Sequence, residues 1–318
     1  MTALPASTIP HNLRAIGLLV VGIAIFSVQD LILKLLSGDY PLPQAMVFRS
    51  LTAAPLIALI VHFDGGLKTL FTPKMMRMIA RGFIVFAPYT LYYLALAALP
   101  LATVVALFFA APLFITILSV PLLKEKVGRA RWLAVLVGFG GVIVMARPGT
   151  DLFDWAAFLA VAAAATYALA MISARQIGKT ETASAMAFWG NAVFLFCAAI
   201  LSLIFGTGRF AEGGHKSLAF LTRAWVTPTP QDLMLMCLCG LIAAVALTLL
   251  TQAYRMGEAS IVASFEYTAM IWGVIYGWIF FADWPTPVGW LGISIISGAG
   301  LFVLWRENRA KALANQTP

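Results

Sequence analysis

The sequence predicts an all-α membrane protein with ten transmembrane helices, arranged as two inverted five-helix repeats around a central cavity. Three observations predict this class. Hydrophobic residues make up 62% of the 318 residues and charged residues only 11%, against about 25% charged in soluble domains. The apolar residues fall in long blocks, and a helix needs about 20 of them to cross the hydrocarbon core. The second half of the chain also repeats the pattern of the first.

Ten apolar blocks are the predicted transmembrane helices, and they leave little chain for a separate soluble domain. The first block is longer than the apolar region of a signal peptide, and Lys34 follows where a small-residue cleavage site would be expected. We therefore interpret it as the first span. In chain order the blocks are residues 14–36, 43–62, 78–99, 101–123, 130–146, 155–176, 182–206, 232–256, 259–281 and 287–305.

The net charge of +8 is explained by topology, and nucleic acid is not an expected partner. If the N-terminus is cytoplasmic, the outer segments carry only Arg147, Arg209, Lys216 and Arg223. This bias towards inner bases sets membrane orientation, so both termini are predicted to be cytoplasmic. The inner bases are Arg14, Lys68, Lys74, Arg77, Arg81, Lys124, Lys126, Arg129, Arg131, Arg175, Lys179, Arg255, Arg306, Arg309 and Lys311.

The two halves of the chain can be aligned with each other. Residues 101–123 match 258–281, and the first spans of the two halves match at an offset of 141, which pairs Phe26 with Tyr167 and Phe48 with Trp189. The predicted repeats are residues 1–150 and 151–318. Because each contains five spans, the second must enter the membrane inverted, an arrangement suited to alternating access.

The fourth and fifth predicted spans carry a family pattern. The sequence resembles the drug/metabolite transporter superfamily, specifically its EamA-like ten-helix members, across nearly its whole length. The second repeat keeps two alanines of the pattern but has Ala269 in place of the proline and Asp283 in place of the glutamate. The matching residues are Ala102, Ala106, Pro112, Lys124, Glu125 and Gly138 to Gly141, with Ala259 and Ala263 in the second repeat and Lys34, Pro41 and Arg49 earlier.

The resemblance implies a secondary transporter of the bacterial inner membrane, with neither an enzyme activity nor a cofactor. Among its members the chain is most similar to exporters of aromatic amino acids and related small metabolites, with protons as a candidate coupling ion. The alternatives are an antiporter of phosphorylated or nucleotide-sugar metabolites and a multidrug or quaternary-cation efflux carrier. A passive channel and an intramembrane enzyme are the other classes, and the enzyme would need clustered His, Asp or Cys.

Few ionisable residues fall inside the predicted spans, where such groups are costly and usually face the bundle interior. Asp30 and Lys34 are four residues apart and share one helical face. With Arg49 they form either an ion-paired triad or the charged wall of a vestibule that holds a substrate carboxylate. Glu266 is either a proton-titrating or counter-charge carboxylate for the substrate, or a structural acid bonded to hydroxyl groups.

Aromatic residues and prolines complete the candidates. Tyr89, Tyr93, Tyr167 and Trp189 lie in mid-span and are either packing residues or the lining of a cavity that stacks aromatic or cationic groups. A proline removes a backbone hydrogen bond and bends a helix. Pro88 and Pro112 are therefore expected to interrupt the third and fourth spans, as gating hinges or static kinks.

Metal and nucleotide sites are not expected. Cys197, Cys237 and Cys239 lie in spans without a ligand spacing, as small buried apolar residues. The histidines are scattered over a tail, a span end and a loop, and there is no phosphate-binding Gly-Lys-Ser loop. The expected partners are therefore a small-molecule substrate and the lipid bilayer.

Overall fold

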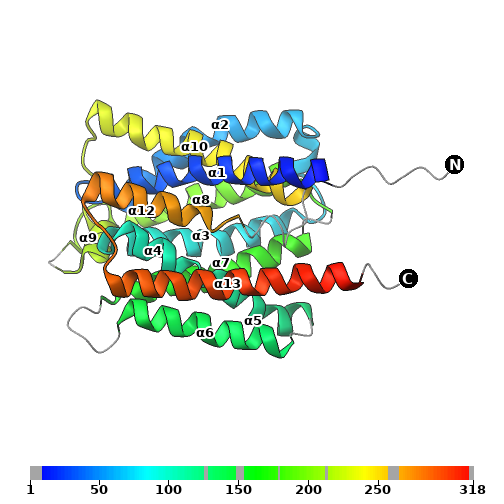
Figure 1. The fold of residues 1–318 in the computed structure, drawn as a ribbon. Helices are drawn as coiled ribbons and strands as arrows, with labels where there is room; N and C mark the ends of the chain where they lie inside the picture. The colour runs from blue at the N-terminus through cyan, green and yellow to red at the C-terminus, as the bar shows by residue number, and fades with distance from the viewer. Residues whose placement is uncertain are drawn as a thin grey trace.

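The structure is a computed structural model that describes residues 9–124, 128–147, 154–177, 180–211, 214–256 and 265–314. Its elements are helices that run side by side along one bundle (Figure 1). The first half contains α1 (Ile9–Leu36), α2 (Leu42–Phe63), η1 (Leu67–Leu70), α3 (Met75–Ala98), α4 (Leu101–Phe108), α5 (Ala111–Leu123) and α6 (Arg129–Ala146). The second contains α7 (Ala156–Ile177), α8 (Ala183–Phe205), α9 (Lys216–Thr222), α10 (Pro230–Met256), α12 (Thr268–Phe281) and α13 (Pro287–Ala314).

The predicted all-α membrane fold is confirmed. Among the described residues, seven helices are long and apolar enough to cross a membrane, and three shorter apolar helices lie at 132–146, 268–281 and 287–302. Each of the ten predicted spans therefore contains helix. Glu125, Ala259 and Ala263 of the family pattern lie outside the described residues.

The two candidate prolines act differently on their helices. The fourth span is broken into α4 and α5 at Phe109 and Ala110, directly before Pro112. A proline at the second position of a helix is well tolerated, because its missing N–H would have no intrahelical partner there. By contrast, α3 continues through Pro88, which is buried inside it. Pro88 therefore does not break the helix, and its role as a gating hinge or static kink stays a prediction.

Helix pairs that pack between the two halves correspond to each other when the helices of one half are exchanged with those of the other. Helix α1 packs on α10, and α3 packs on α7. Helix α2 packs on α10, and α8 packs on α3. In addition, α2 packs on α8, and α6 packs on α13. Exchanging α1, α2 and α3 with α7, α8 and α10 turns the α1–α10 pair into α3–α7 and the α2–α10 pair into α3–α8, and it leaves the α2–α8 pair unchanged. The boundary between the predicted repeats near residue 150 remains a prediction.

Two glycines mark the equivalent close approaches in this exchange. A Cβ atom on Gly82 of α3 would lie 2.8 Å from the Val193 side chain of α8. A Cβ atom on Gly240 of α10 would collide with Thr52 Oγ1 of α2. Thr52 and Val193 are separated by the same offset of 141 that aligns the first spans of the two repeats. Small residues let helix backbones approach closely in a membrane.

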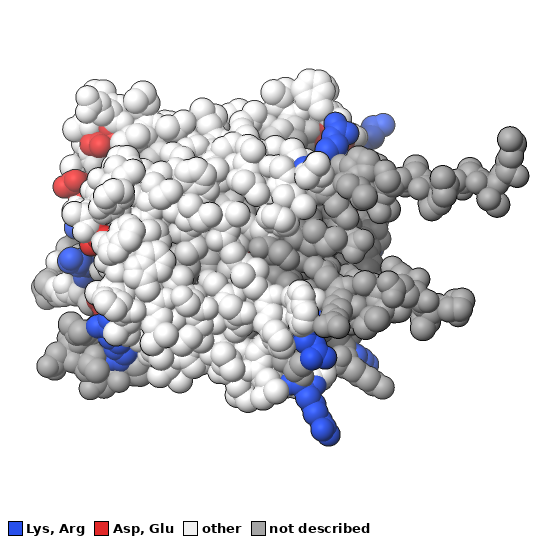
Figure 2. All heavy atoms as spheres, in the orientation of Figure 1, with Lys and Arg blue, Asp and Glu red and all other residues white. Residues whose placement is uncertain are grey.

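The surface separates charged ends from an uncharged belt. On the face drawn in Figure 2, Lys, Arg, Asp and Glu gather at the two ends of the bundle, and the belt between them carries other residues. Leu136, Leu203 and Ile279 are exposed apolar side chains of spanning helices, as expected of residues that face lipid. Helix α1 begins and α13 ends at the same end of the bundle (Figure 1).

Candidate functional site

Tyr89 of α3 is the centre of an aromatic cluster in the bundle interior. Its ring centroid lies 6.1 Å from Phe26 of α1, 6.2 Å from Tyr93 and 5.8 Å from Phe194 of α8. The Phe86 ring meets Phe194 edge-on at 5.1 Å. Aromatic pairs at these separations attract each other beyond the burial of their area.

The cluster continues along α3 towards the second half of the chain. Tyr92 contacts Phe108 of α4 at 5.2 Å, and Phe108 contacts Tyr167 of α7 at 5.1 Å. Five helices of both halves thus contribute to one connected set of rings. We call it the aromatic wall, made of Phe26, Phe86, Tyr89, Tyr92, Tyr93, Phe108, Tyr167 and Phe194.

Arg49 of α2 lies against this wall and is almost fully buried, with 4% of its surface exposed. Its guanidinium carbon is 4.8 Å from the Phe194 centroid and 5.7 Å from that of Tyr89. Its Nε donates a hydrogen bond of 3.2 Å to Gln29 Oε1. A cation that stacks on two rings and has one amide partner is held in a fixed orientation.

Asp30 and Lys34 diverge, although they share one face of α1. Tyr92 donates a hydrogen bond of 3.1 Å to Asp30 Oδ2. Lys34 Nζ donates to the carbonyl oxygens of Leu96 and Leu99, at 3.0 and 2.6 Å, where a cation satisfies carbonyls at the end of a helix. Within the described part of the chain, no ion pair joins Asp30 to Lys34 or Arg49. The expected triad is therefore not formed.

Sequence reasoning missed Gln29, which connects Arg49 to the wall. Its side chain is fully buried, accepts from Arg49 through Oε1 and donates through Nε2 to the Tyr93 hydroxyl. Buried amides need such partners, because an unpaired polar group in a low-dielectric interior is costly. A single glutamine in an apolar span has no spacing or charge pattern that indicates its partners, so the sequence did not point to Gln29.

Tyr89 and Tyr167 present open hydroxyl groups to the interior. Both side chains are only half-buried, and no hydrogen bond joins either hydroxyl to another described residue. Glu266, directly before α12, lies within electrostatic range of Tyr167 and of Tyr267. The rings of Tyr89, Tyr93 and Tyr167 and the Arg49 guanidinium thus belong to one connected cluster, and Glu266 is linked to it by its electrostatic interaction with Tyr167.

Arg81 of α3 belongs to the same region, although the sequence analysis counted it among the inner loop bases. It lies within electrostatic range of Tyr89 and Tyr167, and its Nε atom is buried without a hydrogen-bond partner among the described residues. A base near a span end is indistinguishable from a topological charge in one sequence. Only the packing of α3 on α7 shows that Arg81 lies near Tyr167.

Trp189 lies apart from the aromatic wall. Its Nε1 donates a hydrogen bond of 3.0 Å to the Leu70 carbonyl of η1, and its ring packs in a second cluster with Ile57, Val61 and Ala185. The structure therefore does not bring Trp189 to the interior region with the other candidates.

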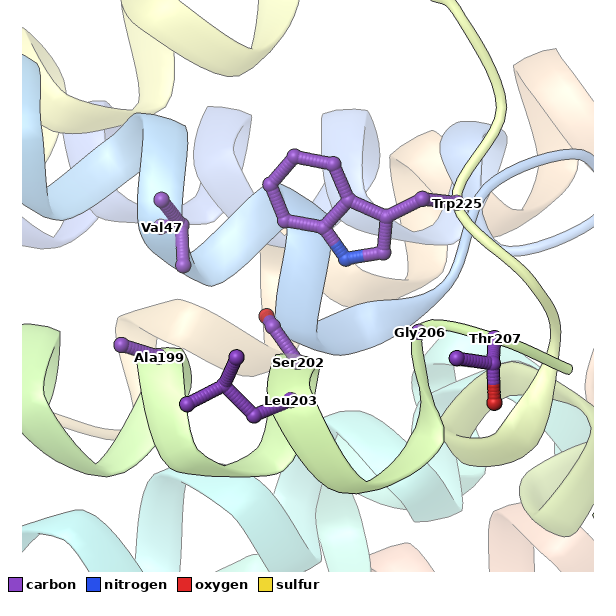
Figure 3. A pocket seen from close by; sticks show the side chains of 7 residues that line it. All are labelled: Val47, Ala199, Ser202, Leu203, Gly206, Thr207 and Trp225. Carbon is purple, nitrogen blue, oxygen red and sulfur yellow. The ribbon is translucent and has the colours of Figure 1, made fainter.

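The pocket drawn in Figure 3 is a different feature. It is an open apolar groove of about 460 Å³ between α2 and α8, at the end of α8. Val47, Leu203 and Trp225 are among the residues that line it (Figure 3). The groove has no charged lining residue, and none of its lining residues belongs to the aromatic wall. It is therefore separate from the interior cluster.

Metal chemistry has no support among the described residues, where no group of three His, Cys, Asp or Glu side chains could hold a metal ion. Cys197, Cys237 and Cys239 are free cysteines. The interior region instead combines ring faces, hydroxyl groups, a carboxylate and guanidinium groups. Such a lining can stack a planar ligand and bond its polar edges.

Comparisons with known proteins agree with the helical transporter fold. Residues 13–147 match the EamA-like transporter family. A solved structure superposes with a TM-score of 0.63 at 16% identity, over 93% of this chain and 97% of that one. At that identity the likeness concerns the fold alone.

Curated relatives cover nearly the whole chain. A riboflavin transporter of Rhizobium johnstonii is 29% identical over 93% of this chain and 92% of that protein. An S-adenosylmethionine uptake transporter of Rickettsia felis is 26% identical over 96% and 97%. A riboflavin transporter of Vibrio cholerae is 27% identical over 96% and 98%. The solutes in these names are riboflavin and S-adenosylmethionine, which each contain a heteroaromatic ring system, whereas the sequence analysis expected amino acids and related small metabolites.

Proposed function

We propose, from the premise that this chain is an EamA-like transporter of the drug/metabolite transporter superfamily, that it carries planar heteroaromatic metabolites. Riboflavin is the first candidate and S-adenosylmethionine the second, because these are the solutes in the names of its relatives. A transporter of this family is not an enzyme.

The observation that carries the proposal is the aromatic wall with Tyr89 at its centre. Its rings come from α1, α3, α4, α7 and α8, so it lies between the two halves of the chain. The Tyr89 and Tyr167 hydroxyls are open at its surface. A flavin or an adenine ring stacks well on such faces, and the hydroxyls select its polar edge.

Amino acid export, the earlier expectation, is less well supported by the geometry. It came from the family resemblance, and the sequence analysis offered Arg49 as one way to hold a substrate carboxylate. That guanidinium is already stacked on Phe194 and Tyr89, bonded to Gln29 and almost fully buried. Freeing it would cost those interactions, so Arg49 better suits the role of a fixed positive charge behind the wall.

Transport by alternating access between inverted repeats is part of the proposal. The exchange of helix pairs between the halves and the equivalent contacts of Gly82 and Gly240 support two related units. The common end of the two termini supports an even number of spans. Transporters of this design place the solute near mid-membrane, between the repeats.

We further propose the bacterial inner membrane as the location, with cytoplasmic termini and inward transport. Orientation is inferred from the bias of Lys and Arg towards the predicted inner segments. Inward transport is inferred from the word uptake in the names of the S-adenosylmethionine relatives. Glu266 and Asp30 are the carboxylates available for proton coupling.

The test is uptake by the purified chain in proteoliposomes, with labelled riboflavin, S-adenosylmethionine, tryptophan and phenylalanine. We expect saturable uptake of riboflavin or S-adenosylmethionine above that of both amino acids. Phe194→Ala, in the aromatic wall, should reduce this uptake strongly. Phe196→Ala, on the same helix but 57% exposed, is the matched control and should not. Uptake of the amino acids alone would contradict the proposal.

A further inference from the structure

We infer that Arg81 binds the hydrogen-bond-acceptor end of the transported solute and that Asp30, at the other end of the aromatic wall, binds its hydroxyl or amino end. This inference rests on the proposed function, because it assigns the two polar ends of the same site.

Arg81 is a charged residue inside a spanning helix, and it has no hydrogen-bond or ion-pair partner among the described residues. It lies in the second turn of α3, within the apolar segment Met75–Ala98. No hydrogen bond or ion pair joins its guanidinium to another described residue, and its Nε atom is buried. A guanidinium has five donors and cannot be neutralised at ordinary pH. The buried Nε–H of Arg81 lacks an acceptor among the described residues, and the partly exposed tip is open to one.

The surroundings of Arg81 place that acceptor in the solute path. The guanidinium lies within electrostatic range of the Tyr89 and Tyr167 hydroxyls, which belong to the aromatic wall and are themselves open. Nε is buried while the side chain as a whole is partly exposed, so the tip of the guanidinium is the part that a solute can reach. By contrast, Arg77, one turn earlier on α3, has an exposed side chain.

Asp30 provides the second pole. Tyr92 occupies its Oδ2 atom, but Oδ1 is buried and has no hydrogen-bond partner among the described residues. Tyr92 follows Arg81 by eleven residues (92 − 81) on α3. Eleven residues make about three turns and about 16 Å of helix, so the two poles share one face of α3. The Tyr89 hydroxyl lies between them, within electrostatic range of both.

The class of solute follows from this order of groups. Arg81 can donate two parallel hydrogen bonds to adjacent carbonyls or to a carboxylate. The rings between the poles stack a planar heterocycle, and a free carboxylate oxygen accepts from hydroxyl or amino groups. The site therefore fits an elongated heteroaromatic solute with an acceptor edge at one end and hydroxyl or amino donors at the other.

Riboflavin and lumiflavin separate the two poles. Both have the same carbonyl-bearing ring edge, but lumiflavin has a methyl group in place of the hydroxylated chain of riboflavin. We expect Arg81→Gln to raise the KM of both flavins by about tenfold or more, because each loses a charge-assisted hydrogen bond. Asp30→Asn should raise the KM of riboflavin alone. Arg77→Gln is the matched control and should leave both values unchanged.

Three further measurements keep the inference falsifiable. Arg81→Lys, which retains the charge but not the paired donors, should give a KM between those of the unchanged chain and Arg81→Gln. With Cys197, Cys237 and Cys239 replaced by Ala, Arg81→Cys should react with an anionic methanethiosulfonate reagent. Riboflavin should slow this reaction.

The inference is overturned if Arg81→Gln behaves like Arg77→Gln, if Asp30→Asn affects both flavins equally, or if Arg81→Cys does not react. Failure of the unchanged chain to take up either flavin or S-adenosylmethionine would instead contradict the proposed function.

Discussion

The guanidinium carbon of Arg49 lies 4.8 Å from the ring centroid of Phe194, so a cation on α2 stacks on a ring of α8. The same guanidinium lies 5.7 Å from Tyr89 of α3 and bonds Gln29 of α1. Four helices from both halves therefore meet at one buried charge. Its geometry fixes the rings that we propose as the solute contact.

Replacing Arg49 tests this role. In Arg49→Lys the charge remains, but the planar group that stacks on both rings is lost. Desolvated cation–π contacts are worth about 2 kcal/mol, and each 1.4 kcal/mol is about tenfold. We expect riboflavin uptake to fall by about tenfold or more. Arg77→Lys, at an exposed position of α3, should retain full uptake, and equal rates for the two variants would refute the stacking role.

Gly240→Ala should destabilise the bundle, because the new methyl group would collide with Thr52 and would come 2.9 Å from the backbone nitrogen of Ala53. Separating α2 from α10 should cost about 1–3 kcal/mol, the usual effect of overpacking. Thermal unfolding in detergent measures the change. Gly17→Ala on α1, where no atom lies within 4 Å of the new Cβ, should be neutral or slightly stabilising. Equal melting temperatures for both variants would contradict the close approach.

Gln44 anchors the segment that follows α9. Its Nε2 donates to the Val226 carbonyl at 2.7 Å, and its Oε1 accepts from the Val226 N–H at 3.2 Å. Gln44→Met keeps the volume but removes both hydrogen bonds to Val226. Because Val226 is exposed and water can replace the lost partner, the cost should be about 0.5–1.5 kcal/mol for each bond. We expect a lower melting temperature and faster proteolysis between Gly214 and Thr229. Gln231→Met, at an exposed position of α10, should change neither, and an unchanged proteolysis rate in Gln44→Met would count against the anchor.

Glu266→Gln tests proton coupling. If the carboxylate carries the coupled proton, the variant should still exchange solute across the membrane, but an imposed proton gradient should no longer drive accumulation. Riboflavin uptake with and without a pH gradient measures this. Asp30→Asn is the parallel variant at the second available carboxylate. Gradient-driven accumulation that persists in Glu266→Gln would remove this residue from the coupling role.

The fold was largely predictable from the sequence, because a helix in lipid must be long and apolar. All ten predicted segments contain helix, and most of their limits agree within a few residues. The exceptions are α1, which begins five residues earlier, α13, which ends nine residues later, the fourth segment, which is broken in two, and the ninth, which leaves the described residues. Pro112 coincides with a break, whereas Pro88 does not, because neighbouring helices can stabilise a helix that has lost one backbone hydrogen bond.

The site was only partly predictable. Tyr89, Tyr93 and Tyr167 come together, but the phenylalanines that join them resemble any other apolar residue of a span. Spacing placed Asp30 and Lys34 on one face, yet Lys34 binds the final carbonyls of α3 and Asp30 binds Tyr92. The orientations of Asp30 and Lys34 depend on hydrogen-bond partners on or next to α3, and one sequence does not show which helices pack together.

The most direct test of the central claim is equilibrium binding of riboflavin to the purified protein, measured by quenching of flavin fluorescence. Stacking on tyrosine quenches a flavin, so the account predicts saturable quenching that S-adenosylmethionine or lumiflavin reverses and that Tyr89→Ala abolishes. Tyr276→Ala, on α12 and stacked with Trp272 instead, should retain it. Absence of saturable quenching, or equal quenching in Tyr89→Ala, would contradict the account.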